Sequence, residues 1–290
     1  MIFDTIRSST GRSISFELFP PKDEKQQHIL EETIAAIAPL GPDFMSVTDR
    51  DGGTMRKKTA EVCRHVIEKA GVPAVAHLTG LGTDKNEMRD ILDHFHESGI
   101  RAIMALRGDF LPGREIVGAG AFAHATDLIE AIRADGRFLI GCAAYPDGHP
   151  EAPSREADWE VLKDKFRAGA DFAVTQIFFD NRSYSDLVDA VMGAFPAARI
   201  LPGILPLTNW KTQKRFIDKC QASVPASLAG RLNLLEENPV TCRRIGIEYS
   251  IRQCEDLLET HQAPGIHIYS LNRSTAAAEL VTVLRLNGRL

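Results

Sequence analysis

Eight short apolar runs, each followed by a longer amphipathic stretch, run through this sequence of 290 residues. Most of the runs are near-continuous in apolar residues instead of alternating with polar ones. This pattern is typical of parallel strands that are covered on both faces. Strands are therefore expected at residues 13–19, 44–48, 74–79, 102–107, 139–145, 172–179, 200–205 and 266–271.

The stretches between the runs carry the apolar periodicity of helices. Ser154 is the expected N-cap of one helix and Gly169 its expected stop, and Gly71 and Gly99 are the expected stops of two others. Residues 225–261 add further helical material before the last strand. Helices are expected at residues 25–37, 59–70, 84–98, 121–135, 154–168, 181–195, 209–220, 238–260 and 273–286.

Eight strands, each followed by a helix, predict one (β/α)8 TIM barrel with an extra helical segment before the last strand. No repeat or break in composition marks a boundary, so residues 1–290 are expected to form a single catalytic domain. The alternative is a doubly wound open sheet. Eight strands is large for such a sheet, and Phe19-Pro20-Pro21-Lys22 stands where its glycine-rich fingerprint would follow the first strand.

The charge balance argues against a nucleic-acid partner. Lys and Arg total 34 and Asp and Glu total 39, for a formal charge of −5 and a pI of about 6.0, so no nucleic acid is expected as a partner.

No signal peptide is visible and no apolar run approaches the ~18 residues of a membrane span, so no membrane association is expected. Five scattered cysteines without a C-x-x-C pair favour reduced thiols in a cytoplasm.

Polar residues interrupt or follow the apolar runs near their carboxyl ends. In a barrel these ends meet at one mouth, and reactive groups come from there. The repetition over seven strands points to an active site at that mouth. The residues concerned are Glu17, Thr48, His77, Arg107, Asp109, Tyr145, His149, Gln176, Tyr269, Asn272 and Arg273.

Several of these signals have a purely structural alternative. Glu17 is either a carboxylate paired inside the barrel or a general acid whose pKa is raised by apolar neighbours. His77 is either a hydrogen-bonded core histidine or a functional one. Gly52 and Gly53, before a basic helix start, either hold a phosphate on free N–H groups or form a tight turn. The sequence has neither an H-E-x-x-H motif nor an Asp-rich calcium loop, so no metal site is expected.

A series of short motifs resembles the methylenetetrahydrofolate reductase family, in its single-domain bacterial form. Any one motif is weak, but together they follow the order of the family along essentially the whole chain. They are Ser15-Phe16-Glu17-Leu18-Phe19-Pro20-Pro21-Lys22, Ser46-Val47-Thr48, Ala76-His77-Leu78-Thr79, Ala105-Leu106-Arg107-Gly108-Asp109, Ala144-Tyr145-Pro146, His149-Pro150-Glu151-Ala152, Thr175-Gln176-Ile177-Phe178-Phe179-Asp180, Pro202-Gly203-Ile204-Leu205-Pro206 and Tyr269-Ser270-Leu271-Asn272-Arg273.

The resemblance implies reduction of 5,10-methylenetetrahydrofolate to 5-methyltetrahydrofolate by NADH or NADPH, in two hydride transfers through bound FAD. It leaves open which nicotinamide cofactor is used and in which direction the reaction runs in the cell. The flavin carries the difficult chemistry, and the protein positions and polarises it. The family commonly assembles into dimers or tetramers, so a homo-oligomer is expected.

The resemblance also assigns roles to particular residues. Glu17 matches the general acid that protonates the amine nitrogen as the folate ring opens, and Asp109 matches an aspartate beside the flavin and the pterin. The matches to substrate-binding positions are Gln176, Phe216, Tyr269 and Arg273. The matches to FAD-contact positions are Thr48, His77, Arg107, Gly108, Asp109, Ala121, Tyr145, His149, Ala152, Asp158 and Lys165.

The chain also departs from the family pattern. Asp49-Arg50-Asp51 replaces a common Tyr-Gly-Ala, Val161 replaces a polar flavin contact, and Thr212 replaces a common glutamine, with Gln213 beside it. Two alternatives to the reductase follow. One is a flavin-free folate-binding or partner subunit that lost flavin through the change at Asp49. The other is a different FAD-dependent barrel oxidoreductase, of the proline dehydrogenase kind.

Overall fold

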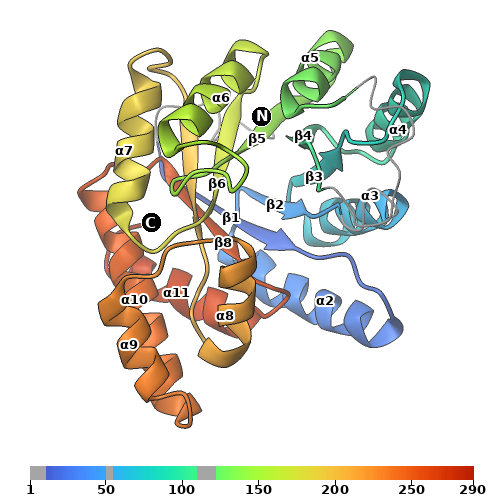
Figure 1. Cartoon of the computed structure of the whole chain (residues 1–290). Helices are drawn as coiled ribbons and strands as arrows, with labels where there is room; N and C mark the ends of the chain where they lie inside the picture. The colour runs from blue at the N-terminus through green and yellow to red at the C-terminus, as the bar shows by residue number, and fades with distance from the viewer. Residues whose placement is uncertain (1–10, 50–54, 110–121) are drawn as a thin grey trace.

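The computed structural model describes residues 11–49, 55–109 and 122–290, and within them eight parallel strands close into a barrel with helices around it (Figure 1). The strands pair in chain order, and β1 pairs with β8 to close the ring. The predicted (β/α)8 barrel is confirmed. The strands are β1 (Ser13–Leu18), β2 (Phe44–Val47), β3 (Ala74–Thr79), β4 (Ala102–Leu106), β5 (Leu139–Ala144), β6 (Phe172–Ile177), β7 (Arg199–Ile204) and β8 (Gly265–Tyr269).

Helices link the strands on the outside of the barrel, and most lie where the sequence predicts them. A 3-10 turn, η1 (Ala38–Leu40), extends α2, and a π-helical turn, η2 (Val66–Ala70), extends α3. The helices are α2 (Glu24–Ile37), α3 (Arg56–His65), α4 (Lys85–Glu97), α5 (Ala125–Asp135), α6 (Arg155–Arg167), α7 (Asn181–Met192), α8 (Trp210–Lys219), α9 (Ala226–Leu234), α10 (Pro239–Glu259) and α11 (Ser274–Leu286).

The helix ends follow the expected capping chemistry. The Ser154 hydroxyl accepts a hydrogen bond from Ala157 N at 3.2 Å, which confirms the predicted N-cap of α6. Gly169 follows that helix with a φ of +114°, a backbone conformation that few other residues adopt. The prediction for α5 was wrong at its start, which is Ala125 and not residue 121. The reason is local: His124 is the N-cap, and the Asp127 carboxylate accepts from its backbone N–H at 2.8 Å.

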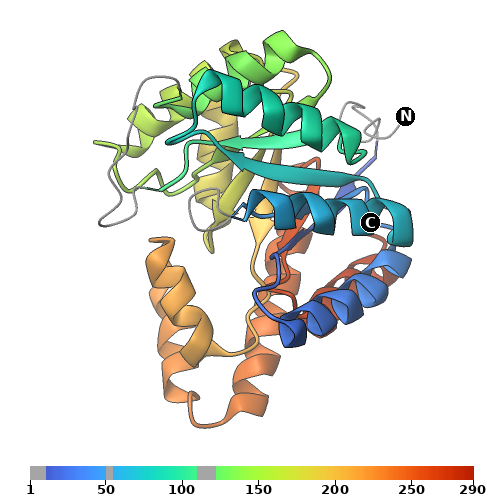
Figure 2. The ribbon, with the colours of Figure 1, turned by 90° about the vertical axis from the view of Figure 1, so that its right-hand side faces the viewer.

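The extra helical segment before β8 is present and consists of two helices, α9 and α10. Figures 1 and 2 both show α8, α9 and the start of α10 extending beyond one side of the barrel. Their apolar side chains form a separate core with the ends of β6 and β7, which includes Trp210, Leu228 and Ile245. Gly246 lets α10 pack closely against the segment that follows β7, since a Cβ at this position would collide with the backbone of Leu207.

The inside of the barrel has an apolar and a polar half. Side chains alternate between the two faces of a strand, so one set points to the helices and the other to the barrel axis. The apolar cluster on the axis includes Leu139, Phe172 and Leu201 of β5, β6 and β7, and it extends through β4 and β3 to Phe44 of β2, where it meets the polar side. On the side of β1, β2 and β8, the buried residues include Ser15, Ser46 and His267.

No helix in the described ranges is long and apolar enough to cross a membrane. The five cysteines are all unpaired.

Candidate active site

Glu17 lies at the carboxyl end of β1, where the polar half of the barrel opens at its mouth. Its backbone is in register with Ser46 of β2 and Tyr269 of β8, so neighbouring strands flank it on both sides. Only 6% of Glu17 is exposed. Because burial disfavours the charged form, the pKa of this carboxyl is raised from 4.5 to about 8. The group is therefore a protonated acid at neutral pH.

His77, on β3, is one of the titratable groups near this acid, together with Tyr269 and Cys220. Its Nε2 lies 3.7 Å from Glu17 Oε2, which is too long for a hydrogen bond. Burial lowers the pKa of His77 from 6.5 to about 4, so the imidazole is neutral at pH 7. Two neutral polar groups therefore face each other here, and they do not form an ion pair. His77 Nε2 has no hydrogen-bond partner among the described residues.

His267, a fully enclosed histidine on β8, belongs to the polar half of the barrel. The Ser15 hydroxyl lies 2.8 Å from its Nδ1, and the Ser46 hydroxyl lies 3.5 Å from its Nε2. Its ring stacks on Phe44 at 5.8 Å between centroids. Burial lowers its pKa to about 3, so it is also neutral. Sequence analysis missed this residue, although its position two before Tyr269 places both on one face of the strand.

A cleft of about 840 Å³ opens at the ends of β3, β4 and β5 and along α6. It has room for a ligand larger than a single nucleotide base. Asp49 and Thr79, which neighbour the predicted contacts Thr48 and His77 in the sequence, also line it, and so does Val161 on α6. Ala121 lies outside the described residues. Of the other predicted FAD contacts, those that line the cleft are Arg107, Gly108, Asp109, Tyr145, His149, Ala152, Asp158 and Lys165.

Hydrogen bonds fix the charged groups of the cleft. The Arg107 guanidinium donates to both carboxylate oxygens of Glu151 at 2.5 and 2.9 Å. This bidentate pair raises the pKa of Arg107 and joins the end of β4 to the β5–α6 loop. Lys165 is buried and donates from Nζ to the Ala143 carbonyl at 2.8 Å. Asp158 is also buried on α6, seven residues before Lys165, and burial raises the pKa of its carboxyl.

Tyr145 and His149 form an aromatic corner in the same cleft. Their rings meet edge to face with 4.8 Å between centroids. His149 Nδ1 accepts a hydrogen bond from Glu151 N at 3.1 Å, so any ring proton sits on Nε2 in the neutral form. Tyr145 lies beside the buried lysine, whose Nζ is 5.7 Å from the centre of the tyrosine ring. The corner offers a flat apolar surface next to a cation.

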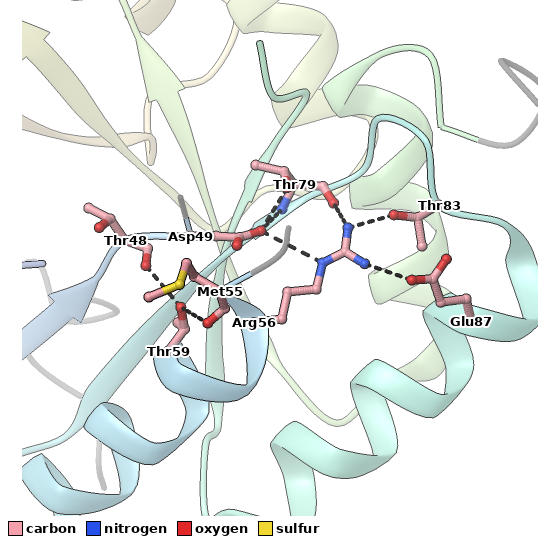
Figure 3. Close-up of polar contacts among 8 residues, drawn as sticks. All are labelled: Thr48, Asp49, Met55, Arg56, Thr59, Thr79, Thr83 and Glu87. Atoms are coloured by element: carbon pink, nitrogen blue, oxygen red, sulfur yellow. Dashed lines mark hydrogen bonds and ion pairs between the residues drawn. The ribbon is translucent and has the colours of Figure 1, made fainter. Parts of the chain in front are cut away.

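Asp49, the first of the three residues that depart from the family pattern, follows β2, and its side chain is bonded to the end of β3 (Figure 3). Its Oδ2 accepts from the backbone N–H of Thr79 at 3.1 Å and from the hydroxyl of Thr79 at 2.7 Å. Arg56 lies 3.8 Å from the same oxygen. Arg56 also donates to the Thr79 carbonyl at 3.0 Å and to the Thr83 hydroxyl at 2.6 Å, and it pairs with Glu87 at 3.0 Å. Asp49 is thus held by neighbouring loops, while Arg50 and Asp51 lie outside the described residues.

The predicted substrate-binding residues surround the opposite side of the mouth. Gln176 on β6 accepts from Ile177 N at 2.8 Å through its side-chain carbonyl, which leaves its amide N–H₂ group for other partners. Phe216 is half-buried on α8, against the core that α9 and α10 complete. Arg273 is exposed and forms the N-cap position of α11.

Tyr269 is fixed by a hydrogen bond to β6, and a glycine on β7 makes room for its ring. Its hydroxyl donates to the Thr175 carbonyl at 2.7 Å, across β7 from its own strand β8. A Cβ on Gly203 would lie 2.5 Å from the tyrosine ring, so only glycine lets the ring pass. The Gly203 N–H in turn donates to the Thr175 hydroxyl at 2.8 Å.

Gln213 has a structural role. Its side-chain carbonyl accepts from Thr208 N at 2.6 Å and Asn209 N at 2.8 Å, and its amide donates to the Pro206 carbonyl at 2.8 Å. These bonds cap the start of α8 and engage both the carbonyl and the amide of this buried glutamine. Thr212 is exposed.

Buried polar atoms without partners mark where a ligand fits. Among the described residues, Thr48 Oγ1 and His77 Nε2 are both buried and unpaired, and both lie at the ends of neighbouring strands. Such atoms are costly unless something bonds to them. A flavin has ring carbonyl and N–H groups that suit a hydroxyl and an imidazole. These two residues and the cleft beside them therefore fit FAD. No group of acidic, histidine or cysteine side chains suited to a metal occurs in the described parts of the chain.

The fold and the site define a (β/α)8-barrel protein with a buried acid and a ligand cleft at the carboxyl mouth. The sequence matches the methylenetetrahydrofolate reductase family over residues 3–285, and the chain belongs to that family.

Curated relatives agree with this assignment. The 5,10-methylenetetrahydrofolate reductase of Escherichia coli K12 is 34% identical over 262 residues, which cover 90% of this chain and 87% of the relative. A probable methylenetetrahydrofolate reductase (NADPH) of Caenorhabditis elegans is 32% identical over 94% of this chain and 42% of its own length. Methylenetetrahydrofolate reductase (NADH) 1 of Arabidopsis thaliana is 30% identical over 98% of this chain and 51% of its own length.

Solved structures share the fold at low sequence identity. An uncharacterized protein from Clostridium thermocellum that binds two copies of 5-methyl-5,6,7,8-tetrahydrofolic acid superposes with a TM-score of 0.66 at 16% identity, over 100% of this chain and 99% of that one. Oxaloacetate acetylhydrolase has a TM-score of 0.54 at 12% identity, over 99% of this chain and 84% of that one.

Proposed function

We propose that this protein reduces 5,10-methylenetetrahydrofolate to 5-methyltetrahydrofolate with NADH or NADPH, using bound FAD. The observation that carries the proposal is Glu17, a buried carboxyl that stays protonated at neutral pH, at the same mouth of the barrel where the cleft opens. Membership of the reductase family supports the substrate. The names of relatives contain both nicotinamide cofactors, so the proposal covers either one.

FAD would be held by the cleft between β3 and α6. Arg107 and Lys165 supply positive charge there, Asp109 is exposed at its edge, and the aromatic corner of Tyr145 and His149 supplies a flat surface. When bound, FAD supplies a two-electron carrier between the nicotinamide and the folate. The negative charge of Asp109 disfavours an anionic reduced ring and so favours hydride donation.

Glu17 would give its proton to the amine nitrogen of the folate as the five-membered ring opens. A general acid works best when its pKa lies near the working pH, and a carboxyl in water is far too acidic for this. The enclosure at the end of β1 solves the problem by keeping the group out of water. His77 does not oppose this, because a neutral imidazole leaves the acid protonated.

The other side of the mouth would bind the substrates. Gln176 offers an amide to the pterin or the nicotinamide, and Phe216 on α8 offers a ring for stacking. Tyr269 borders the acid, and its ring is fixed by Gly203 and Thr175. Arg273 is exposed at the start of α11, where a guanidinium suits the carboxylates of a folate tail.

A cytoplasmic location, a single catalytic domain and a homo-oligomer remain predictions from the sequence and its resemblance.

The test is an absorbance spectrum of the purified protein, followed under anaerobic conditions. We expect a flavin spectrum that bleaches on addition of NADH or NADPH and recovers on addition of methylenetetrahydrofolate. A colourless protein that still binds folate would favour the flavin-free alternative. A flavin that bleaches but recovers only with other oxidised substrates would favour a different barrel oxidoreductase.

A further inference from the structure

The turn that follows β8 holds the end of β1, and with it the backbone of Glu17. The paired register of β1 and β8 ends at Glu17 and Tyr269. Beyond this point Leu271 and Asn272 adopt left-handed backbone conformations, with φ of 50° and 53°. Such residues are uncommon outside glycine and are maintained only when the surrounding structure holds them. The chain turns away from β1 here, so backbone pairing cannot continue.

Beyond this point, side chains of the turn form the hydrogen bonds to β1 that a neighbouring strand's backbone would otherwise form. The Ser270 hydroxyl donates to the Glu17 carbonyl at 2.7 Å. The Asn272 side chain accepts from Phe19 N at 2.9 Å and donates to the Phe19 carbonyl at 2.9 Å. The amide of Asn272 therefore pairs with both backbone groups of one residue, as a neighbouring strand would. On the other side of β1, Thr48 N donates to the Leu18 carbonyl at 3.0 Å.

The turn is itself tied down. The backbone N–H of Asn272 donates to the Ser270 hydroxyl at 3.2 Å, so one serine links the turn to the Glu17 carbonyl. The Thr33 hydroxyl on α2 donates to the Asn272 carbonyl at 3.0 Å. Ser270 is 5% exposed. The result is a connected set of hydrogen bonds around the last residues of β1, with no water needed to complete it.

We propose that Ser270 and Asn272 are positioning residues for Glu17, which they hold in its enclosed position at the mouth by continuing the β1–β8 ladder through their side chains. This inference rests on the proposed function, because it concerns the acid of that reaction. Neither residue touches the acid's carboxyl group. They act on its backbone, and a small displacement of an enclosed acid lets water reach it and changes both its geometry and its proton affinity.

The experiment uses two variants and one control in the full chain. Asn272→Gly keeps the left-handed backbone accessible but removes both hydrogen bonds to Phe19. Ser270→Ala is the milder variant, since it removes only one hydroxyl. It tests the proposal if Asn272→Gly fails to fold. Gln262→Gly is the matched control, since Gln262 also has a left-handed φ of 51° but is exposed and precedes β8 at the other end of the barrel.

The first readout needs no ligand. The infrared band of the protonated Glu17 carboxyl, identified as the difference from Glu17→Gln, is followed against pH. In the unaltered protein it should disappear near pH 8. In Asn272→Gly and in Ser270→Ala it should disappear at least about one pH unit lower, because the loosened strand end admits water. An unchanged titration in both variants would overturn the inference.

The second readout separates the two half-reactions. Reoxidation of the flavin by methylenetetrahydrofolate should slow about tenfold or more in Asn272→Gly, since the acid is displaced. Reduction by NADH or NADPH should stay within about twofold, because it needs no acid. Equal loss in both half-reactions would mean a general structural defect and overturn the inference. Absence of folate-dependent reoxidation in the unaltered protein would instead refute the proposed function, while the infrared titration still tests the turn.

Discussion

The two halves of the barrel interior are equally buried, but they are held together in different ways. Around β5, β6 and β7, Phe172 and its neighbours fill the axis with apolar side chains. Around β1, β2 and β8, the hydroxyls of Ser15 and Ser46 bracket the ring of His267. The polar half has hydrogen bonds but no charge, because the buried imidazole is neutral and the acid above it is protonated. Burial away from water raises the pKa of Glu17.

The comparison would break if removing a large side chain from the apolar half had little effect. Phe172 is fully buried and meets Phe44 edge to face at 6.0 Å. We expect Phe172→Ala to lower the free energy of unfolding by about 3–5 kcal/mol, because it leaves a cavity that rigid strands cannot close. Chemical denaturation measures this. Leu286→Ala, at a site that is 81% exposed, should change stability by less than about 0.5 kcal/mol.

A second test asks whether the polar half serves the reaction more than the fold. Glu17→Gln keeps shape and neutrality but cannot donate a proton to the folate. We expect folate-dependent reoxidation of the flavin to fall about 100-fold or more, equivalent to about 2.7 kcal/mol, with reduction by the nicotinamide cofactor unchanged. Stopped-flow absorbance separates the two steps. Normal folate turnover would reject the role of Glu17, and Glu31→Gln on the exposed face of α2 serves as the control.

A third test concerns the hydrogen bonds beneath the acid. Ser15→Ala leaves His267 Nδ1 buried without its 2.8 Å partner, and we expect a loss of about 1–3 kcal/mol in the free energy of unfolding. Replacing both partners, in Ser15→Ala with His267→Leu, should recover part of that loss, because the unpaired imidazole nitrogen is gone and only the Ser46 hydroxyl loses a contact, at 3.5 Å. Denaturation of the single and double variants measures the difference. A double variant that adds the full cost of each change would contradict the pairing.

The last expected effect is on the pH dependence of stability. Glu17 keeps its proton in the folded state up to about pH 8, while the unfolded state loses it near 4.5. Raising the pH between these values therefore favours unfolding, by up to about 1.4 kcal/mol per unit. His77 and His267, with folded pKa values of about 4 and 3, act in the opposite direction below pH 6.5.

The window from about pH 7 to 8 largely isolates the carboxyl, because both histidines are neutral in the folded state and mostly neutral in the unfolded state there. Denaturation midpoints should fall with pH in the unaltered protein and stay flatter in Glu17→Gln. The same slope in both proteins would mean that the acid titrates near its ordinary value, and the contrast between the two halves would lose its electrostatic basis.

The sequence predicts the barrel because each strand is an apolar run that a helix pattern follows. It also predicts Glu17, Tyr145 and His149 as candidate site residues, since polar residues stand out at the ends of such runs, but it does not predict that the two rings meet. It does not predict His267 as a partner of Ser15, because that contact joins strands 252 positions apart in the chain. The start of α5 was misplaced for a similar reason: the periodicity fits several starting points, and the Asp127 cap decides among them.

The change at Asp49 was the hardest to interpret from sequence. A carboxylate in place of a common aromatic residue suggested a disturbed flavin contact. In the structure this side chain is completely covered and contacts both Thr79 and Arg56, and the effect on flavin binding stays a prediction. Only the fold brings Arg56 and Thr79 to the same point, so no pattern in the sequence shows that the new charge has partners.

The Asp49–Arg56 pair also has an evolutionary consequence. Without Arg56, Asp49 would be a fully covered carboxylate with no cation beside it, whereas Arg56 keeps Glu87 at 3.0 Å when Asp49 is lost. Removing one partner of a buried pair typically costs about 3–5 kcal/mol, and here that cost falls on loss of the arginine. A lineage can therefore exchange the acid for an aromatic ring and keep the arginine. Homologues that carry the acid should also carry the arginine, and homologues with the acid alone should be rare.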